Sequence, residues 1–247
     1  GSDTNILVRF DVPNKRIDLV SLPRDTLLHN EYRNNKLNFA YAKGGTELLM
    51  EQIENLLGIP VDFYVTVNLK GFIALVDQID GVDFDIPINM DYDDPYQDLH
   101  IHFTKGPRHL NGQEAMEVVR FRHNNDGTGY GTEDIGRIGT QQAFLKAVAK
   151  QLLQIGNVKN IPALVDIFYT YVKTDLTTGN LVWLGNEALN IGTENIHFAT
   201  LPGDGSGYYN KQSVYVLDAQ ATCDLVNEAL NPYNEALTLE DMDILVP

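Results

Sequence analysis

Hydrophobic and polar positions along this 247-residue chain follow two periods in turn, one typical of strands and one typical of helices. The runs NILVRFDV (5–12) and RIDLVSL (16–22) are rich in aliphatic and β-branched residues and flank a turn at Pro13, which predicts a β-hairpin. Over 46–57 apolar residues recur at helical spacing, and Gly58 provides a stop. The first quarter of the chain therefore predicts two strands followed by a helix.

The remaining sequence continues to interleave strand and helix patterns. Asn111 and Glu114 have the spacing of a capping box, so a helix should begin at Gly112. The further predicted strands are 61–69, 82–88, 99–103, 195–203 and 213–218, and the further predicted helices are 71–79, 112–119, 141–153, 181–190 and 219–230. Interleaved strands and helices predict an α/β fold, in which residues 3–247 form a single domain with a mixed central sheet flanked by helices.

The composition is ordinary for a soluble globular protein, with 43% hydrophobic and 21% charged residues. No apolar run approaches the roughly 20 residues that a membrane-spanning helix needs. We interpret Gly1-Ser2 as a cloning scar, which is compatible with a missing upstream segment such as an N-terminal membrane anchor. The sequence contains one cysteine, Cys223, so an internal disulfide is excluded. We expect the Cys223 side chain to be buried in a helix.

The charge distribution contains a local contrast. A formal net charge of -16 argues against a nucleic-acid binder, because long-range attraction to phosphates is lacking. Yet the stretch VVRFRHNNDGTGYGTEDIGR (118–137) holds Arg120, Arg122 and Arg137 around a glycine-rich run. This contrast predicts a local anion site within an otherwise acidic protein.

The positions of these arginines relative to the predicted elements favour convergence. Arg120 and Arg122 follow the predicted helix 112–119, and their alternation allows both to point to one side. Asp134, Arg137 and Gln141 are spaced three and four apart, so they share one face of a helix. Each arginine alone is equally compatible with a surface ion pair. Convergence of four or five by chance is a poorer explanation in a chain with only 18 Lys and Arg.

A second polar segment adds both charges. In SLPRDT (21–26), Arg24 and Asp25 follow a predicted strand. Arginine suits a diphosphate because its planar guanidinium binds phosphate oxygens in pairs and stays charged. A hard divalent cation would need carboxylate ligands, and Asp3 and Asp25 lie in this part of the chain and could supply them. Mg²⁺ typically takes one or two carboxylates together with phosphate oxygens and water.

Several motifs together resemble one known family. They are SDTNILVRFDVPNKRIDLVSLPRDT, KLNFAYAKGG, VDFYVTVNLKGFIALVDQIDGVDFDIP, LNGQEAMEVVRFRH and EDIGRIGTQQAFLKA. Their order and content are similar to the LytR-CpsA-Psr family over about residues 3–150, whereas 151–247 carries less diagnostic sequence. The resemblance implies an extracellular cell-wall phosphotransferase, anchored in the bacterial cell membrane. Such an enzyme moves a glycopolymer, teichoic acid or capsule, from a polyprenyl-pyrophosphate carrier onto a peptidoglycan acceptor.

The resemblance also implies roles for individual residues. The catalytic centre would comprise Arg120, Arg122, Asp134 and Arg137, with Asp134 either orienting arginines or acting as a base for the acceptor hydroxyl. Asp3 would be a ligand of the Mg²⁺ cofactor, and Asp25, noted above for its position in the sequence, is the further candidate ligand. The residues implied to bind the pyrophosphate are Arg24, Lys36, Arg120, Arg122, Arg137 and Gln141.

Two departures from the family pattern concern this site. The family usually begins with another strand that carries an additional aspartate near the metal, and this sequence lacks it, which weakens the Mg²⁺ assignment. Thr140 stands where many members have an arginine, and the run NNDGTGYGTE (124–133) is longer than usual. The cluster is then smaller than in many members, and the loop is either a gate for the acceptor or a disordered surface loop.

A polyprenyl chain also requires an apolar tunnel, because it is not stable in water. The apolar stripes of 46–57, 71–79 and 141–153 are candidate walls, but such stripes more often belong to an ordinary core, and the sequence does not separate the two. Two other functions remain open on the sequence. One is a non-enzymatic protein that binds wall polymer or prenyl lipid and regulates envelope assembly, and the other is a pyrophosphatase that hydrolyses the lipid carrier.

Overall fold

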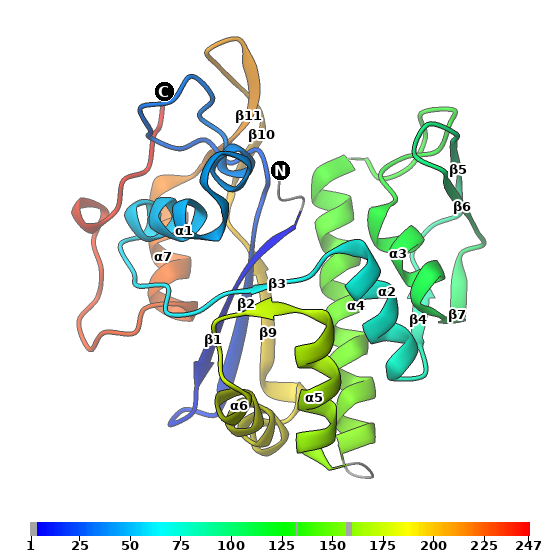
Figure 1. Cartoon of the computed structure of the whole chain (residues 1–247). Helices are drawn as coiled ribbons and strands as arrows, with labels where there is room; N and C mark the ends of the chain where they lie inside the picture. Colours follow the sequence, from blue (N-terminus) through cyan, green and yellow to red (C-terminus); the bar gives the residue numbers. More distant parts are fainter. Residues whose placement is uncertain (1–3, 132, 157–159) are drawn as a thin grey trace. The chain divides into compact units, whose positions relative to one another are not determined.

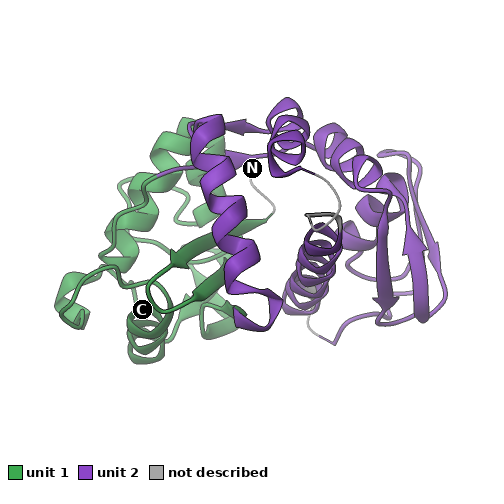
Figure 2. Cartoon of the chain, turned by 90° about the horizontal axis from the view of Figure 1, so that it is seen from below, with its two compact units in different colours: residues 1–62, 196–247 green, residues 63–195 purple. Residues whose placement is uncertain are grey.

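The computed structural model describes residues 4–131, 133–156 and 160–247 (Figure 1). The chain forms two compact units (Figure 2). Unit 1 comprises Gly1–Asp62 and Ile196–Pro247, and unit 2 comprises Phe63–Asn195. The α/β fold class with a mixed sheet and flanking helices is confirmed, while the boundaries 3–247 stay a prediction.

The sheet of unit 1 confirms the predicted hairpin. Strand β1 (Asn5–Asp11) pairs antiparallel with β2 (Arg16–Leu22), and β2 pairs in parallel with β9 (Ile196–Thr200). The order β1-β2-β9 makes this sheet mixed. Because β2 is its central strand, most of its residues are buried.

Helices and a second hairpin complete unit 1. Helix α1 (Leu37–Leu57) begins nine residues before the predicted start, and Gly44 and Gly45 interrupt it with non-helical backbone angles. The later elements are β10 (Gly203–Tyr209), β11 (Gln212–Leu217), α7 (Ala219–Ala229) and the 3-10 helix η2 (Leu239–Asp241). Side chains of α1, β2, β11 and α7 form the core, and Cys223 is buried there as predicted.

Unit 2 contains two nested pairs of antiparallel strands and most of the helices. Strand β4 (Val82–Ile86) pairs with β7 (Gly106–Leu110), and between them in sequence β5 (Met90–Asp94) pairs with β6 (Leu99–Phe103). The helices are α2 (Leu69–Gln78), α3 (Gly112–Arg120), α4 (Glu133–Gly156), α5 (Ile161–Tyr171) and α6 (Thr178–Ile191), followed by the 3-10 helix η1 (Thr193–Asn195). Apolar residues of α2, α3, α4 and the four strands form one core.

One predicted strand is largely absent. Within 61–69 only Val65–Thr66 is a strand, β3, which pairs with β8 (Lys173–Thr174). The alternating apolar side chains of this segment are about half exposed, so the pattern does not mark a strand face packed on a core. They are Phe63, Val65, Val67 and Leu69, with exposed fractions of 53%, 47%, 45% and 49%. The prediction of a half-buried strand here is wrong.

Candidate functional site

In unit 1, the segment after β2 brings three of the predicted site residues together. The Oδ1 atom of Asp25 lies 3.3 Å from Nζ of Lys36 and 3.9 Å from Nε of Arg24. A backbone bridge between Leu27 and Lys36 places the start of α1 beside this segment. The three side chains are 19–33% exposed. Two cations therefore flank one carboxylate at a partly exposed position.

Hydrogen bonds to its backbone hold the segment after β2 in place. Thr26 is fully buried, and its hydroxyl donates to the carbonyl of Pro23 at 2.6 Å. The amide of Tyr215 on β11 donates to the carbonyl of Asp25, and the amide of Leu37 donates to the carbonyl of Thr26. Because these bonds fix the backbone on both sides, the Asp25 and Lys36 side chains start from a rigid frame.

In unit 2, Arg120 is positioned by a well-formed helix. The capping box of α3 is present as predicted, with the Asn111 side chain accepting from the Glu114 amide and the Glu114 side chain accepting from the Asn111 amide. Arg120 is the last residue of α3, where a cation complements the helix dipole. Its Nη2 atom donates to Oε1 of Gln97 at 2.9 Å, in the β5–β6 turn.

The centre of the predicted site in unit 2 is Asp134, near the start of α4. Its Oδ1 atom accepts a hydrogen bond from Nη2 of Arg137 at 2.8 Å, and Nη2 of Arg122 lies 3.7 Å away. Arg137 is only 6% exposed, whereas the Arg122 side chain is 42% exposed. A buried guanidinium requires a paired carboxylate, because loss of one partner leaves an uncompensated charge. This geometry favours the orienting role of Asp134 over the role of base.

Gln141 connects α4 to α3. Its Nε2 atom donates to the carbonyl of Val119 at 3.2 Å, next to Arg120. The spacing of Asp134, Arg137 and Gln141 therefore places them on the face of α4 that meets the segment after α3. Within unit 2 the structure brings together Arg122, Asp134 and Arg137, with Arg120 reaching the β5–β6 turn instead.

The described part of the 124–133 run is a small hydrogen-bonded loop. His123 and Gly129 form a backbone bridge, and the Asn124 amide donates to the Thr128 carbonyl at 2.7 Å. The hydroxyls of Tyr130 and Thr140 lie 2.6 Å apart. Sequence reasoning noted Thr140 only as the replacement of an arginine. Its role in the structure is to anchor this loop to α4.

Tyr130 is the residue that sequence reasoning missed. Its ring packs edge-to-face on Phe121 with centroids 5.6 Å apart, and burial raises the pKa of its phenol. The sequence did offer a signal for Tyr130, because it is the one aromatic residue in the run 124–133, which otherwise contains small and polar residues. Tyr130 and Thr140 fix the path of the chain between Arg122 and Asp134.

The predicted Mg²⁺ ligands are only partly described. Asp3 lies outside the described residues, and Asp25 is already flanked by Lys36 and Arg24. One carboxylate fits a Mg²⁺ site only when phosphate oxygens, water or a second carboxylate complete the shell. Among the described residues, a group of three suitable side chains occurs elsewhere, at Asp91, Asp93 and His102.

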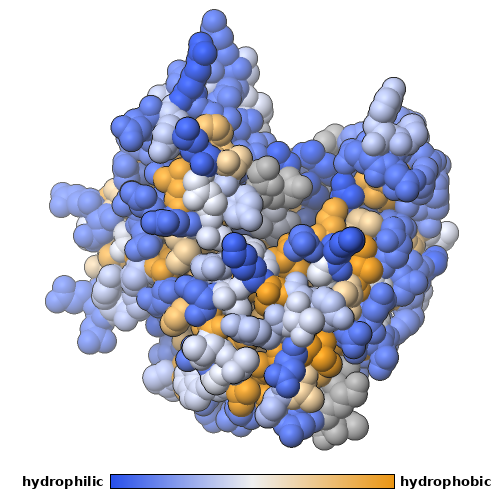
Figure 3. Space-filling view, viewed as in Figure 1, coloured by the Kyte–Doolittle hydropathy of each residue, from blue (hydrophilic) through white to orange (hydrophobic). Residues whose placement is uncertain are grey.

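The apolar stripes proposed as tunnel walls contribute to the two cores. Ile53 and Leu56 of α1 are buried in unit 1, and Val76 of α2 and Phe144 of α4 are buried in unit 2. Unit 2 also exposes apolar side chains at 63–69 and at Tyr169 and Trp183. Figure 3 shows hydrophobic residues gathered on this face over the region of α2 and α5. The tunnel itself stays a prediction.

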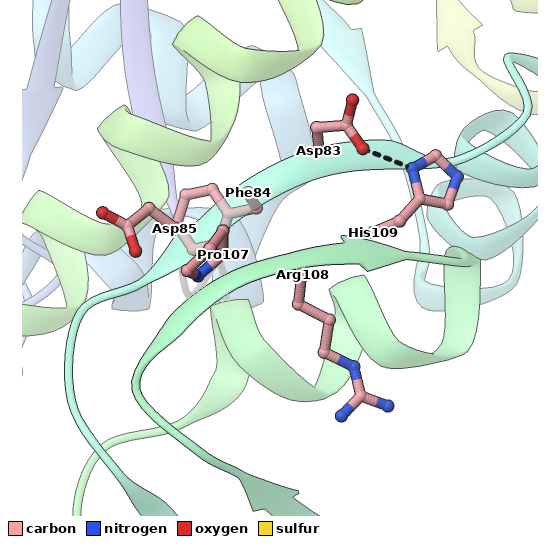
Figure 4. A pocket seen from close by; sticks show the side chains of 6 residues that line it. All are labelled: Asp83, Phe84, Asp85, Pro107, Arg108 and His109. Atoms are coloured by element: carbon pink, nitrogen blue, oxygen red, sulfur yellow. Dashed lines mark hydrogen bonds and ion pairs between the residues drawn. The ribbon is translucent and has the colours of Figure 1, made fainter.

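A shallow pocket on β4 and β7 is separate from the predicted residues. It is lined by Asp83, Phe84, Asp85, Pro107, Arg108 and His109 (Figure 4). None of the residues predicted for the pyrophosphate site lines it.

In the part of the chain that the structure describes, no helix has the length and apolar character needed to cross a membrane.

Comparison with known proteins defines the class of protein. The model of the LytR_cpsA_psr family matches residues 1–231, so this chain belongs to the LytR-CpsA-Psr family. This confirms the resemblance seen in the sequence motifs and extends it beyond residue 150.

Individual relatives agree with this membership. The polyisoprenyl-teichoic acid–peptidoglycan teichoic acid transferase TagV of Bacillus subtilis (strain 168) is 32% identical over 229 residues, covering 90% of this chain and 56% of that protein. The corresponding transferase TagU of Bacillus cereus is 32% identical over 229 residues, covering 92% and 71%. The crystal structure of B. subtilis TagV matches with a TM-score of 0.78 at 28% identity, over 99% of this chain and 91% of that one. The chain thus spans about half of the first relative and about seven tenths of the second.

Proposed function

We propose that this protein transfers an anionic glycopolymer of the teichoic acid or capsule type from a polyprenyl-pyrophosphate carrier to peptidoglycan. The observation that carries the proposal is the 32% identity, over 90% of this chain, to a relative named as a polyisoprenyl-teichoic acid–peptidoglycan transferase. The arginine grouping around Asp134 supports it, because it supplies fixed positive charge in a protein of net charge -16.

The proposed reaction is a phosphoryl transfer. A hydroxyl of the acceptor sugar attacks the phosphorus nearest the donor sugar and forms a new P–O bond. The bond from that phosphorus to the bridging oxygen breaks, and polyprenyl phosphate leaves with the electron pair. The hydroxyl proton passes to a base or to water. Such a reaction needs mainly positioning and charge neutralisation.

The roles in unit 2 follow from exposure and pairing. Arg122 is 42% exposed and only loosely paired, at 3.7 Å from Asp134, so it can turn toward a phosphate oxygen. Arg137 is almost buried and bonded to Asp134 at 2.8 Å, so it fixes the carboxylate and adds positive charge. Arg120 supplies a third guanidinium at the end of α3. The assignment of Arg24, Lys36 and Gln141 to diphosphate binding rests on the family resemblance.

We propose Mg²⁺ as the cofactor, with Asp3 and Asp25 as its protein ligands. When bound, it would neutralise charge on the phosphate oxygens. The polyprenyl chain would contact apolar surface, for which the half-exposed side chains of 63–69 in unit 2 are available. We also place the protein at the bacterial cell membrane with this part outside the cell, as the family resemblance implies.

Arg122→Ala tests the proposal, with Arg108→Ala as the matched control. Arg108 is 47% exposed, pairs with Glu114 and stacks on the Phe103 ring, and it is not among the residues predicted for the site. Release of polyprenyl phosphate from a lipid-linked donor is measured with Mg²⁺ and peptidoglycan. Loss of a donor that stabilises transition-state charge should lower kcat about 10²–10³-fold for Arg122→Ala, whereas Arg108→Ala keeps the wild-type rate. Equal rates for both variants would refute the role of Arg122.

Omission of peptidoglycan distinguishes the alternatives. Transfer requires the acceptor, so polymer should appear on peptidoglycan and donor consumption should fall without it. Equal consumption with and without acceptor would indicate a pyrophosphatase. Binding of the donor without turnover would indicate a regulatory binding protein instead.

A further inference from the structure

The outer face of the β5–β6 hairpin carries a cluster of metal-ligating side chains. Strict alternation in both strands points Met90, Leu99, Ile101 and Phe103 into the core and leaves the intervening residues exposed. Asp91 pairs across the strands with His102, and Asp93 pairs with His100. We call Asp91, Asp93, His100 and His102 the hairpin cluster.

The distances within the hairpin cluster show that its polar atoms converge. His102 places Nδ1 2.8 Å from Oδ1 of Asp91 and Nε2 3.0 Å from Oδ1 of Asp93. His100 places Nδ1 2.6 Å from the same Asp93 oxygen. One ligand atom each from Asp91, Asp93 and His102 can be chosen so that all lie within 4.8 Å of one another. Two carboxylates and an imidazole therefore face one small volume.

We propose that the hairpin cluster binds a divalent transition-metal ion of the Zn²⁺ type through Asp91, Asp93 and His102. Imidazole nitrogen together with carboxylate oxygen is a donor set for such ions, and three protein ligands leave a position for water. His100 bonds the same Asp93 oxygen and is itself bonded to Asp98 at 3.1 Å. A partner of this kind orients a ligating carboxylate.

Simple cross-strand ion pairs account less well for this arrangement. One oxygen of Asp93 accepts from both imidazoles, and His102 has a carboxylate at each of its ring nitrogens. The partly buried carboxyl of Glu117 on α3 also interacts electrostatically with the two histidines. Asp91, Asp93 and Asp98 outnumber the two imidazoles, so even protonated rings leave a net negative charge that a divalent cation would neutralise.

The hairpin cluster is directly joined to the loop that precedes Asp134. The side-chain oxygens of Asn124 and Asn125 accept from the amides of Asp91 and Asp93, each at 2.7 Å. Asn125 also donates its side-chain amide to the Asp93 carbonyl at 3.0 Å. A metal that fixes Asp91 and Asp93 would therefore stiffen the segment that follows Arg122.

The experiment is a titration of the tag-free protein with Zn²⁺ alone, by calorimetry, and with Co²⁺, by visible absorption. One equivalent should bind, and the Co²⁺ spectrum should show d–d bands from a protein-bound ion. His102→Gln should weaken binding more than about ten-fold, since it removes one of the three proposed metal ligands. Asp93→Asn should do the same.

His109→Gln is the matched control. His109 is an exposed histidine of the same unit, on β7, and it bonds one carboxylate, Asp83, at 2.7 Å (Figure 4). Its substitution should leave Zn²⁺ binding unchanged. Absence of a one-equivalent site, or equal weakening by His102→Gln and His109→Gln, would overturn the proposal. Hydrogen exchange at the Asn124 and Asn125 amides should slow on Zn²⁺ addition, and unchanged exchange would refute the link to the loop. These readouts do not depend on glycopolymer transfer.

Discussion

The contact between Tyr130 and Thr140 gives a quantitative test of how the loop is anchored to α4. Thr140 is 4% exposed, and its hydroxyl both meets the Tyr130 phenol at 2.6 Å and donates to the Gly136 carbonyl at 3.2 Å. Tyr130→Phe removes one hydroxyl but keeps the ring on Phe121 and leaves the Thr140 hydroxyl bonded to Gly136. We expect it to lower the free energy of unfolding by about 1 kcal/mol, the net value of a neutral hydrogen bond.

Thr140→Val should cost more, although it preserves side-chain shape. The substitution removes the Thr140 hydroxyl, which is the hydrogen-bond partner of the partly buried Tyr130 phenol. A buried polar group left without a partner costs about 1–3 kcal/mol of stability. In the double variant both polar groups are gone, so it should be more stable than the sum of the single losses predicts. The coupling energy should lie within about 0.5–3 kcal/mol.

Urea denaturation at pH 7 measures these free energies. Far-UV circular dichroism follows the whole chain, and fluorescence of Trp183, the one tryptophan, reports on unit 2, where α6 lies. Equal m-values are required before the midpoints are compared. Wild-type stability of Thr140→Val, or strict additivity of the two substitutions, would refute the idea that the hydroxyl pair anchors the loop.

Two further predictions concern unit 2. Phe144 is 2% exposed and packs between Phe72 and Phe84, with ring centroids 5.6 Å and 5.8 Å away, so Phe144→Ala should cost about 3–5 kcal/mol in urea denaturation. A loss below about 1 kcal/mol would contradict this packing. Burial raises the pKa of Glu117 in the folded protein, although its carboxylate accepts a hydrogen bond from Gln113. Above the pKa of the unfolded state, ionisation of Glu117 therefore opposes folding. Glu117→Gln should therefore stabilise the metal-free protein at pH 7 and lose that advantage below about pH 4, where Glu117 is protonated in both states; a pH-independent effect on the melting temperature would argue against it.

Local signals predicted most of the elements. The hairpin around Pro13 and the capping box of α3 were correct because turn chemistry and caps act within a few residues. The predicted helix over 46–57 begins directly after the break that Gly44 and Gly45 make in α1, whereas the part of α1 before these glycines was not predicted. Strands β5 and β7 were not predicted. MDYDD is rich in aspartate and GPRHL begins with Gly-Pro, residues that are depleted in strands, and both segments form strands through pairing with their partners.

The candidate site was also predictable only in part, because some of its contacts are local in sequence and others are not. Helical spacing correctly put Asp134, Arg137 and Gln141 on one face of α4. Spacing does not give burial, and so it did not distinguish the buried Arg137 from the exposed Arg122. The bond from Arg120 to Gln97 spans 23 positions in sequence, and it depends on the unpredicted strand β5. Long-range contacts of this kind follow from packing rather than from any local motif.

The asparagines that tie the loop to the hairpin also protect the protein from self-association. Among the strands that the structure describes, β5 pairs with β6 alone, and the backbone groups of Asp91 and Asp93 on its other side would form an open sheet edge. Asn124 and Asn125 occupy these donors and acceptors. A second extended chain would have to displace them before it could add a strand, and this protects the edge against aggregation.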